Sequence, residues 1–263
     1  VQCGTQSRST VGLHQAVRWT HEGNLGRLLW ARGTCYKRRQ SIGRVNAPTP
    51  WPIACSGNPA LPAHPDLELK APLVATRRTI RDRVPDPRLH VAFRLPPIGD
   101  PSLPAAEVAC QILASGRGSR LHRRLVRDEQ VAQDVSLDVL AFAGGASLAV
   151  GAATLRPGAS PEQLERCYGE ELARLAAEGP TATEMERALA LIESEEMAKL
   201  GDPEELADEI GGCATLLNDP GRALREVEVY RAVTAEEVRE AAKAFDPARR
   251  ATLWYEPDGA ASA

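Results

Sequence analysis

The chain lacks any apolar run that approaches the ~20 residues needed to cross a membrane. It also lacks, near residue 1, the apolar stretch of about 7–15 residues that forms the middle of a signal peptide. Charged residues make up 25% of the 263 residues, as in ordinary globular domains. The composition therefore excludes a membrane protein, a collagen-like chain and a disulfide-stapled miniprotein, and we expect a cytoplasmic location.

The six cysteines include no C-x-x-C pair. Cys110, Cys167 and Cys213 fall inside predicted helices, where a free cysteine packs as a small apolar side chain. Without an export signal, we expect all six to be reduced thiols.

Charge is distributed unevenly along the chain. Residues 1–63 carry a net charge of +7 and the remaining 200 residues a net charge of −10. The first part shows no sustained helical or strand period and ends in a proline-rich run. We predict an irregular basic segment at 1–70, a domain at 71–257 and a tail at 258–263.

Three stretches of the acidic part are predicted to be strands, and the first two alternate between apolar and polar residues, as strands with one buried face do. They are residues 89–95, 131–139 and 146–155. Gly144 and Gly145 turn the second stretch into the third, which is largely apolar and therefore expected inside the sheet. A short strand at 252–255 closes the domain. The fold class predicted is α+β, with a mixed, largely antiparallel sheet covered by helices on one face and an irregular N-terminal segment.

Helices are expected from about residue 102 and from Ser119, and four more begin at recognisable caps. The caps are Ser160, Thr183, Asp202 and Thr234. Ser160 with Gln163, and Thr183 with Glu186, fit a capping box. The apolar residues that follow each cap have helical spacing, so each helix should present one stripe suited to packing on the sheet.

The stretch from Arg77 to Pro257 resembles the C-terminal-type, inactive domain of the pitrilysin/insulinase family of zinc peptidases, which includes mitochondrial processing peptidase. The resemblance depends on the order of several weak motifs over about 180 residues. These are the strand at 87–96, Gly99-Asp100-Pro101, the turn at 118–121, the segment at 125–132, Gly179-Pro180-Thr181 with Glu184 and Glu186, and the helix start at 233–238.

The resemblance implies a zinc peptidase whose metal lies in another half. The family's active half carries H-x-x-E-H on a helix, where two His bind zinc and the Glu activates water. The histidines of this chain, which include no pair four residues apart, are His14, His21, His64, His90 and His122. We therefore expect no metal site and no catalytic residue here, and zinc in a partner half.

The resemblance also implies two substrate-binding positions. In many family members the partner half supplies an Arg and a Tyr at the end of the second helix and in the following strand. Arg127 stands at the Arg position, and Gln133 replaces the Tyr. An amide can donate a hydrogen bond to an oxyanion but cannot supply a phenol proton. Both residues also have structural interpretations, Arg127 as a cation at a helix C-terminus and Gln133 as a strand residue satisfied by a neighbour.

Two further clusters are interpreted as solvated surface. Glu193, Glu195 and Glu196 fit the solvated face of a long helix. His122, with the nearby Arg120, Arg123 and Arg124, fits a solvated basic helix end.

The basic segment at 1–70 allows two interpretations. It is either a nucleic-acid-binding arm, in which Lys37-Arg38-Arg39 supply charge and Trp30 or Tyr36 stack on bases, or a remnant without a selected fold where the family's catalytic half would lie. We favour the remnant, because the domain that follows has no basic face.

The function expected is the non-catalytic half of a zinc metallopeptidase, inactive alone, which forms part of a peptide-binding chamber with a zinc-bearing partner. The alternatives are a zinc-less structural or scaffold subunit of the same fold and a nucleic-acid binder. The sequence itself does not identify the substrate or the partner.

Overall fold

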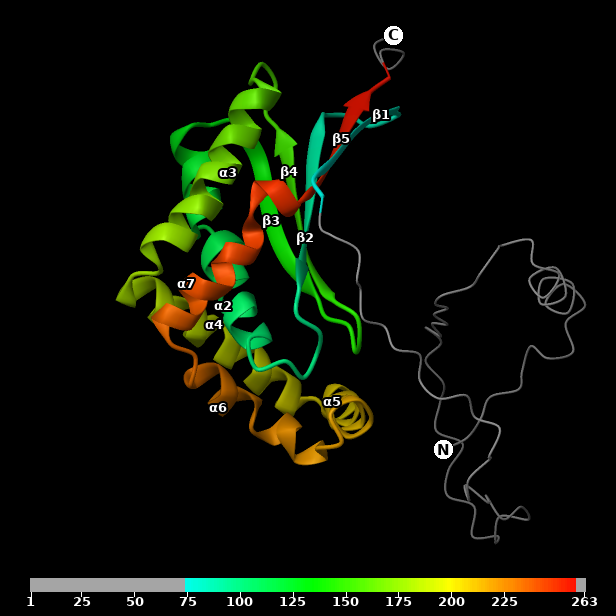
Figure 1. The fold of residues 1–263 in the computed structure, drawn as a ribbon, viewed down its shortest axis with the longest axis vertical. Coiled ribbons are helices and arrows are strands. Elements are labelled where there is room, and N and C mark those ends of the chain that lie inside the picture. Colours follow the sequence, from blue (N-terminus) through cyan, green and yellow to red (C-terminus); the bar gives the residue numbers. More distant parts are fainter. Residues whose placement is uncertain (1–73, 259–263) are drawn as a thin grey trace, which may run out of the picture. The chain divides into compact units, whose positions relative to one another are not determined.

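The computed structural model describes residues 74–258. The expectations for residues 1–70, including the nucleic-acid arm, and for most of the tail lie outside this range. Five strands form one sheet in the order β1-β5-β2-β4-β3 (Figure 1). Their bounds are β1 (Thr76–Asp82), β2 (Arg88–Leu95), β3 (Ala132–Leu140), β4 (Ser147–Leu155) and β5 (Ala251–Pro257).

Only β1 and β5 pair in parallel, and all other neighbours are antiparallel. The β3–β4 hairpin is present, and β4 lies inside the sheet, between β2 and β3. The predicted α+β class with a mixed, largely antiparallel sheet is therefore confirmed. The sequence did not predict the first strand, β1. All seven of its residues are exposed, so it has no buried face and no alternating pattern that would indicate a strand.

The described helices are α2 (Leu103–Ala114), η1 (His122–Asp128), α3 (Pro161–Glu178), α4 (Ala182–Gly201), α5 (Pro203–Leu216), η2 (Pro220–Leu224), α6 (Glu226–Arg231), α7 (Ala235–Ala241), η3 (Ala242–Phe245) and η4 (Pro247–Arg249). Among them, α2 and η1 lie between β2 and β3 in sequence, and the other eight lie between β4 and β5. Within the described range, no helix is long and apolar enough to span a bilayer.

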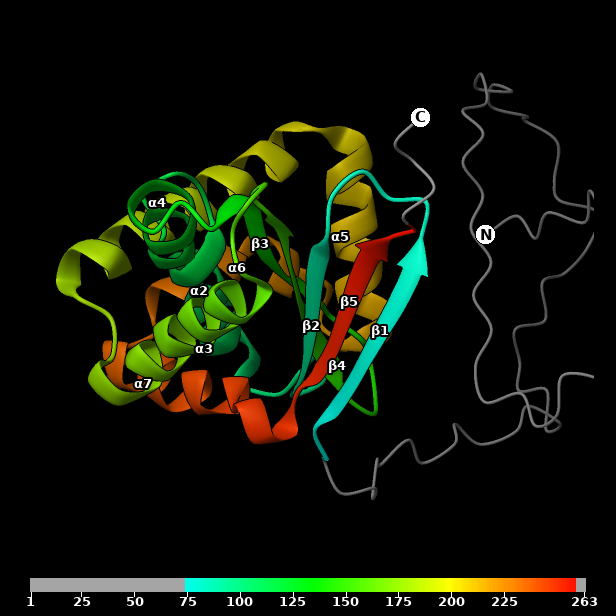
Figure 2. The ribbon, with the colours of Figure 1, turned by 90° about the horizontal axis from the view of Figure 1, so that it is seen from above.

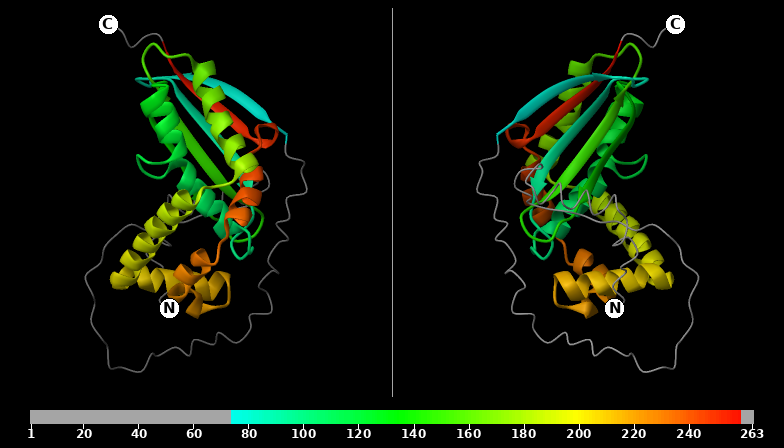
Figure 3. Two further views of the ribbon diagram at one scale, coloured as in Figure 1. Left: turned by 90° about the vertical axis from the view of Figure 1, so that its left-hand side faces the viewer. Right: turned by 90° about the vertical axis from the view of Figure 1, so that its right-hand side faces the viewer.

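The core lies between the sheet and the helices packed on one of its faces (Figures 2 and 3). Along β2, Leu89, Val91, Phe93 and Leu95 are all at most 2% exposed, and the residues between them point to the other face. Phe93 meets Phe245 edge to face, with ring centroids 5.5 Å apart. Burial of four such side chains on one strand is worth several kcal/mol, about 1.5–3 each.

Three of the four predicted caps are confirmed. The Ser160 hydroxyl accepts from Gln163 N–H at 3.2 Å, Asp202 accepts from Glu204 N–H at 2.8 Å, and Thr234 forms a capping box with Glu237. The prediction that Thr183 caps a helix is wrong.

The capping residue of α4 is Thr181, which forms the box with Glu184. Thr181 and Thr183 both have a Glu three residues later, so the pattern fits either. Gly179, at φ +73°, ends α3 and leaves only Pro180 before the new helix. The first threonine therefore takes the position.

Three expectations about surfaces are wrong. Arg120 is buried rather than part of a solvated basic end, with 4% of its side chain exposed. Glu196 is 13% exposed and pairs with Lys199 at 2.7 Å, so it does not lie on a solvated face. No residue of α5 is buried, and its apolar stripe packs beside α4 and η2 rather than on the sheet.

Candidate functional site

The face of the sheet that points away from the core is the first candidate site. Strand pairing aligns Leu253, His90, Ala152 and Ser136 in one row across β5, β2, β4 and β3. Side chains of directly paired residues project to the same face. No helix among residues 74–258 packs on this face, because the helices that contact the sheet lie on the other one (Figure 3). We call it the open face.

The open face carries an apolar strip that crosses the sheet. Its apolar residues run from one edge strand to the other: Ile80, Tyr255, Leu253, Ala92, Ala152, Val150, Leu148 and Leu140. At the edges, Ile80 is 39% exposed and Leu140 is 49% exposed. Charged residues flank this strip on the same face, and the Arg88 guanidinium lies 3.8 Å from the Asp134 carboxylate. The charged residues are Arg78, Asp82, Arg88, Arg94, Asp134 and Asp138. Apolar surface of this kind is typical of a face that contacts another molecule.

His90 and Tyr255 make the aromatic centre of the open face. Their rings meet edge to face with centroids 5.6 Å apart. Partial burial lowers the pKa of His90, and the neighbouring charge of Arg88 lowers it further. The imidazole is therefore neutral at pH 7.

Arg127 lies in the last turn of η1, where the resemblance placed it. Its Nε donates to the Asp128 carboxylate at 3.1 Å, and 67% of the side chain is exposed. The guanidinium is accessible, and its ion-pair partner, Asp128, is also exposed. Both the structural interpretation and a role in binding fit this position.

Gln133 occupies an irregularity in β3, where the register with β4 shifts between Ala132 and Asp134. Its Nε2 donates to Asp86 and to the Leu155 carbonyl, each at 3.1 Å. The side chain is exposed, not part of a buried strand register. Arg127 and Gln133 therefore lie close in sequence, but each is held by different neighbours.

Zinc does not fit the residues that the structure describes. Across positions 74–258, no group of three or more His, Cys, Asp or Glu side chains is placed to hold a metal ion. His90 lies on β2 and His122 begins η1, so the two described histidines sit on separate elements.

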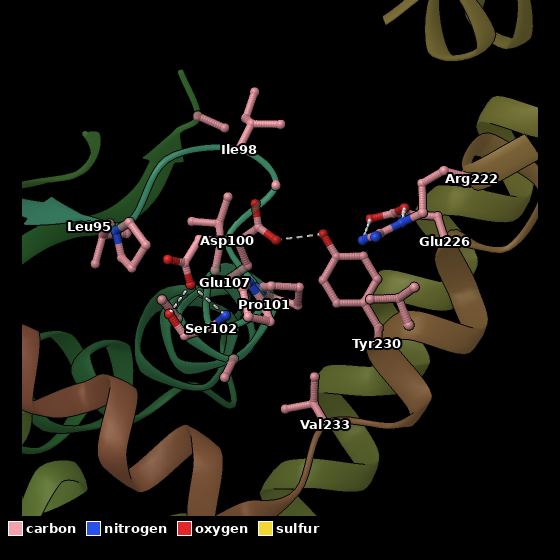
Figure 4. A pocket seen from close by; sticks show the side chains of 18 of the residues that line it. Leu95, Ile98, Asp100, Pro101, Ser102, Glu107, Arg222, Glu226, Tyr230 and Val233 are labelled. Carbon is pink, nitrogen blue, oxygen red and sulfur yellow. Dashed lines mark hydrogen bonds and ion pairs between the residues drawn. The ribbon is translucent and has the colours of Figure 1, made fainter. Parts of the chain in front are cut away.

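A second candidate site is a cavity of about 1070 Å³ between the start of α2 and the helices α4, α5 and α6 (Figure 4). Its apolar wall includes Leu95, Ile98, Leu217, Val229 and Val233. Inside it, Tyr230 donates its phenol hydrogen to the Glu107 carboxylate at 2.7 Å. Burial raises the pKa of Glu107 above its ordinary value, which the hydrogen bond from Tyr230 only partly offsets.

Sequence reasoning missed this cavity. Glu107 and Tyr230 are 123 residues apart, and α6 was not predicted as a helix. The one available signal was Glu107 itself, an acid within the apolar run of a helix that is otherwise almost entirely buried. An acid in such a run indicates a polar contact across the fold.

Comparison with known protein families identifies the family to which this chain belongs. Residues 41–192, more than half of the chain, match the family described as peptidase M16 inactive domain. This match begins upstream of the described residues. No curated protein matches the chain.

Solved structures share the fold. A protease from Helicobacter pylori is 15% identical, with a TM-score of 0.64, over 73% of this chain and 46% of its own. A peptidase M16 inactive domain from Pseudomonas fluorescens is 18% identical, with a TM-score of 0.62, over 70% and 44%. The inactive peptidase domain of a Bordetella parapertussis protein is 23% identical, with a TM-score of 0.60, over 68% and 94%. This chain thus spans about half of the first two proteins and nearly all of the third.

Proposed function

Because this chain belongs to the peptidase M16 inactive-domain family, the family of pitrilysin and insulinase, we propose that it is the non-catalytic half of a zinc metallopeptidase. In this proposal its open face forms one wall of a chamber, and a zinc-bearing partner half forms the other. A peptide lies between them and is cleaved at the partner's metal. The chain itself contributes surface and orientation rather than chemistry.

The observation that carries this proposal is the open face. A sheet with helices on one side normally buries its other side or exposes polar residues there. Here an apolar strip crosses all five strands from Ile80 to Leu140, with a neutral His90 and Tyr255 at its centre. A surface of this kind favours contact with a peptide or a partner domain.

Of the two predicted substrate-binding residues, we assign peptide contact to Arg127 rather than to Gln133. A side-chain amide has two N–H groups. Gln133 already uses both, because it donates to the Asp86 carboxylate and to the Leu155 carbonyl. The Arg127 guanidinium has five N–H donors, and its exposed ion pair with Asp128 is weak. Arg127 can therefore bind a peptide carbonyl or carboxylate without breaking a strong contact.

The test is reconstitution with a zinc-bearing M16 half encoded beside this chain's gene. A quenched fluorescent peptide library is incubated with each half alone and with the mixture. We expect cleavage only in the mixture and its loss when zinc is chelated. Cleavage by this chain alone that a chelator abolishes would contradict the proposal.

A scaffold subunit is the outcome if the two halves form a stable complex but cleave no peptide in the library. Nucleic-acid binding through the basic segment is tested separately, by titrating the full chain with a fluorescent oligonucleotide at 50 and 200 mM salt. A binding constant that falls steeply with salt would support it.

We further propose that the chain acts in the cytoplasm. Reduced cysteines would be stable there, and Cys110 and Cys167 are buried free thiols. Cell fractionation with an antibody against the chain tests this, and recovery outside the cytoplasm would contradict it.

A further inference from the structure

The cavity of Figure 4 contains a carboxylate, Glu107, that forms no ion pair with any residue from 74 to 258, although Lys199 is near enough to lower its pKa. Glu107 lies in α2 and accepts one hydrogen bond, from the Tyr230 hydroxyl on α6, through its Oε2 (Figure 4). The bond from Tyr230 engages only this oxygen of the carboxylate. A half-buried carboxylate without an ion-pair partner loses part of its hydration, which makes its ionised form costly.

The two cations of the cavity wall are already engaged. Lys199 Nζ lies 2.7 Å from Glu196 and 3.4 Å from Glu209. The Arg222 guanidinium pairs with Glu226 through two of its nitrogens. Neither cation can serve Glu107 without leaving another carboxylate unpaired.

The whole lining has an excess of negative charge. Two cations, Lys199 and Arg222, face seven acids: Asp100, Glu107, Glu196, Glu209, Glu226, Glu237 and Glu240. Asp100 is held by Ser102, and Glu237 caps α7 at Thr234. Glu107 is thus the acid for which an added cation would gain most, because it is the one whose pKa burial raises.

A second cavity adds an unused acceptor beside Glu107. It has a volume of about 420 Å³ and shares Glu107, Glu196, Lys199 and Tyr230 with the first. Gln111, one helical turn after Glu107, lines it, and in the described structure the buried Gln111 Oε1 has no hydrogen-bond partner. Residues four apart lie on the same side of a helix, so the unpartnered Gln111 Oε1 and the Glu107 carboxylate are acceptors on one face of α2.

From this geometry we propose that the cavity binds an organic cation, an ammonium or guanidinium group attached to an apolar body. The cation pairs with Glu107, and the apolar body packs on Leu95, Ile98, Leu217, Val229 and Val233. The proposal does not depend on the chamber, because the cavity and the open face are formed by different residues. The same chemistry could come from a free amine or from a basic side chain of a peptide.

The experiment titrates the full chain by calorimetry with three probes of one size: n-hexylammonium, 1-hexanol and hexanoate. We expect the ammonium to bind about tenfold or more tightly than the alcohol, because a charged hydrogen bond is added, and hexanoate not to bind. Equal affinity for the ammonium and the alcohol would overturn the proposal. So would the absence of binding of every cationic probe used.

A second arm uses acetyl-Leu-Lys-Leu-amide and its norleucine analogue. Tighter binding of the lysine peptide than of n-hexylammonium would identify a peptide side chain as the source of the cation. The reverse order would identify a free amine. Both orders support the cation site, provided that each cation exceeds its neutral analogue.

Variants test whether Glu107 is the partner. Glu107→Gln keeps size and removes charge, and should weaken n-hexylammonium binding about tenfold. The matched control is Glu178→Gln, a 67% exposed glutamate at the end of α3, which should leave binding unchanged. Equal affinities of Glu107→Gln and the wild type would overturn the assignment.

A second variant tests the site even if Glu107→Gln does not fold. Tyr230→Phe removes the phenol donor and leaves both carboxylate oxygens to the ligand. It should bind n-hexylammonium at least as tightly as the wild type. Loss of binding in a folded Tyr230→Phe protein would contradict the proposed site.

Discussion

Arg120 is the residue whose replacement should destabilise this domain most clearly. Its guanidinium holds the Glu184 carboxylate with two hydrogen bonds, from Nε at 2.8 Å and from Nη2 at 2.7 Å. Nη2 also donates to the Gly179 carbonyl at 2.9 Å. Because Glu184 belongs to the capping box of α4, one buried arginine joins the start of η1, the end of α3 and the start of α4. The perturbation is Arg120→Met, which keeps much of the side-chain volume and removes the charge.

The magnitude follows from the Glu184 carboxyl. Burial alone would raise its pKa, but hydrogen bonds from Arg120 and from the Thr181 backbone outweigh burial and lower the pKa from 4.5 to about 2. That difference corresponds to about 3 kcal/mol of folding free energy at pH 7. Removing one member of a buried pair also leaves the other uncompensated, so we expect Arg120→Met to cost about 3–5 kcal/mol.

The sign of the pH dependence follows from the lowered pKa. Glu184 stabilises the folded state fully above about pH 5, and this contribution is lost as the pH falls toward 2. At pH 3 about 1.5 kcal/mol of it remains. The difference in stability between the wild type and Arg120→Met should therefore shrink by about half between pH 7 and pH 3. The part that remains combines the residual Glu184 contribution with the hydrogen bond to Gly179.

The assay is urea unfolding followed by circular dichroism at pH 7, 5 and 3. Arg123→Met is the matched control, because Arg123 lies 4.0 Å from the same carboxylate but is 43% exposed. An exposed pair of this kind is worth about 0–1 kcal/mol. Equal destabilisation by the two variants would refute the reasoning. A gap between the wild type and Arg120→Met that is as large at pH 3 as at pH 7 would do the same.

Three further predictions concern single positions. Thr181→Ala removes the cap of α4 and should lower the free energy of unfolding by about 1 kcal/mol in the same assay, with Thr183→Ala as a nearly neutral control. Gly151→Ala would place a methyl group 2.2 Å from the Tyr168 hydroxyl oxygen and should cost about 1–3 kcal/mol, part of which Tyr168→Phe should restore in the double variant. Arg127→Ala should change stability by less than about 0.5 kcal/mol, because the side chain is 67% exposed, yet lower peptide cleavage by the reconstituted pair. Unchanged cleavage would leave Arg127 with its structural role.

The strands and caps of this fold could be predicted because their signals are local. The buried face of β2 is indicated by alternation over eight residues. The helix caps Ser160 and Thr234 are indicated by the residue three positions later, whose backbone N–H each of them accepts. Thr181 and Thr183 could not be separated in this way, because their local patterns are the same. The choice between them depends on where α3 ends and on Arg120, which lies 64 residues from Glu184.

The candidate sites were predictable only in part. Arg127 and Gln133 could be located by resemblance, but the contacts that occupy Gln133 come from Asp86 and from Leu155 on another strand. The open face follows from the register of five strands, which a sequence does not give. The cavity needs α6 to meet α2, and α6 is a six-residue helix without a side-chain cap.

The pairing of β1 has a consequence for how the domain is made. β1 has β5 as its strand neighbour, and β5 is the last strand of the described domain. During synthesis, the first strand must therefore wait unpaired until about 170 residues that follow it have left the ribosome. A nascent chain or a truncation that ends before Ala251 would leave both β1 and one edge of β2 without hydrogen-bond partners, and both edges would be open to association with other chains.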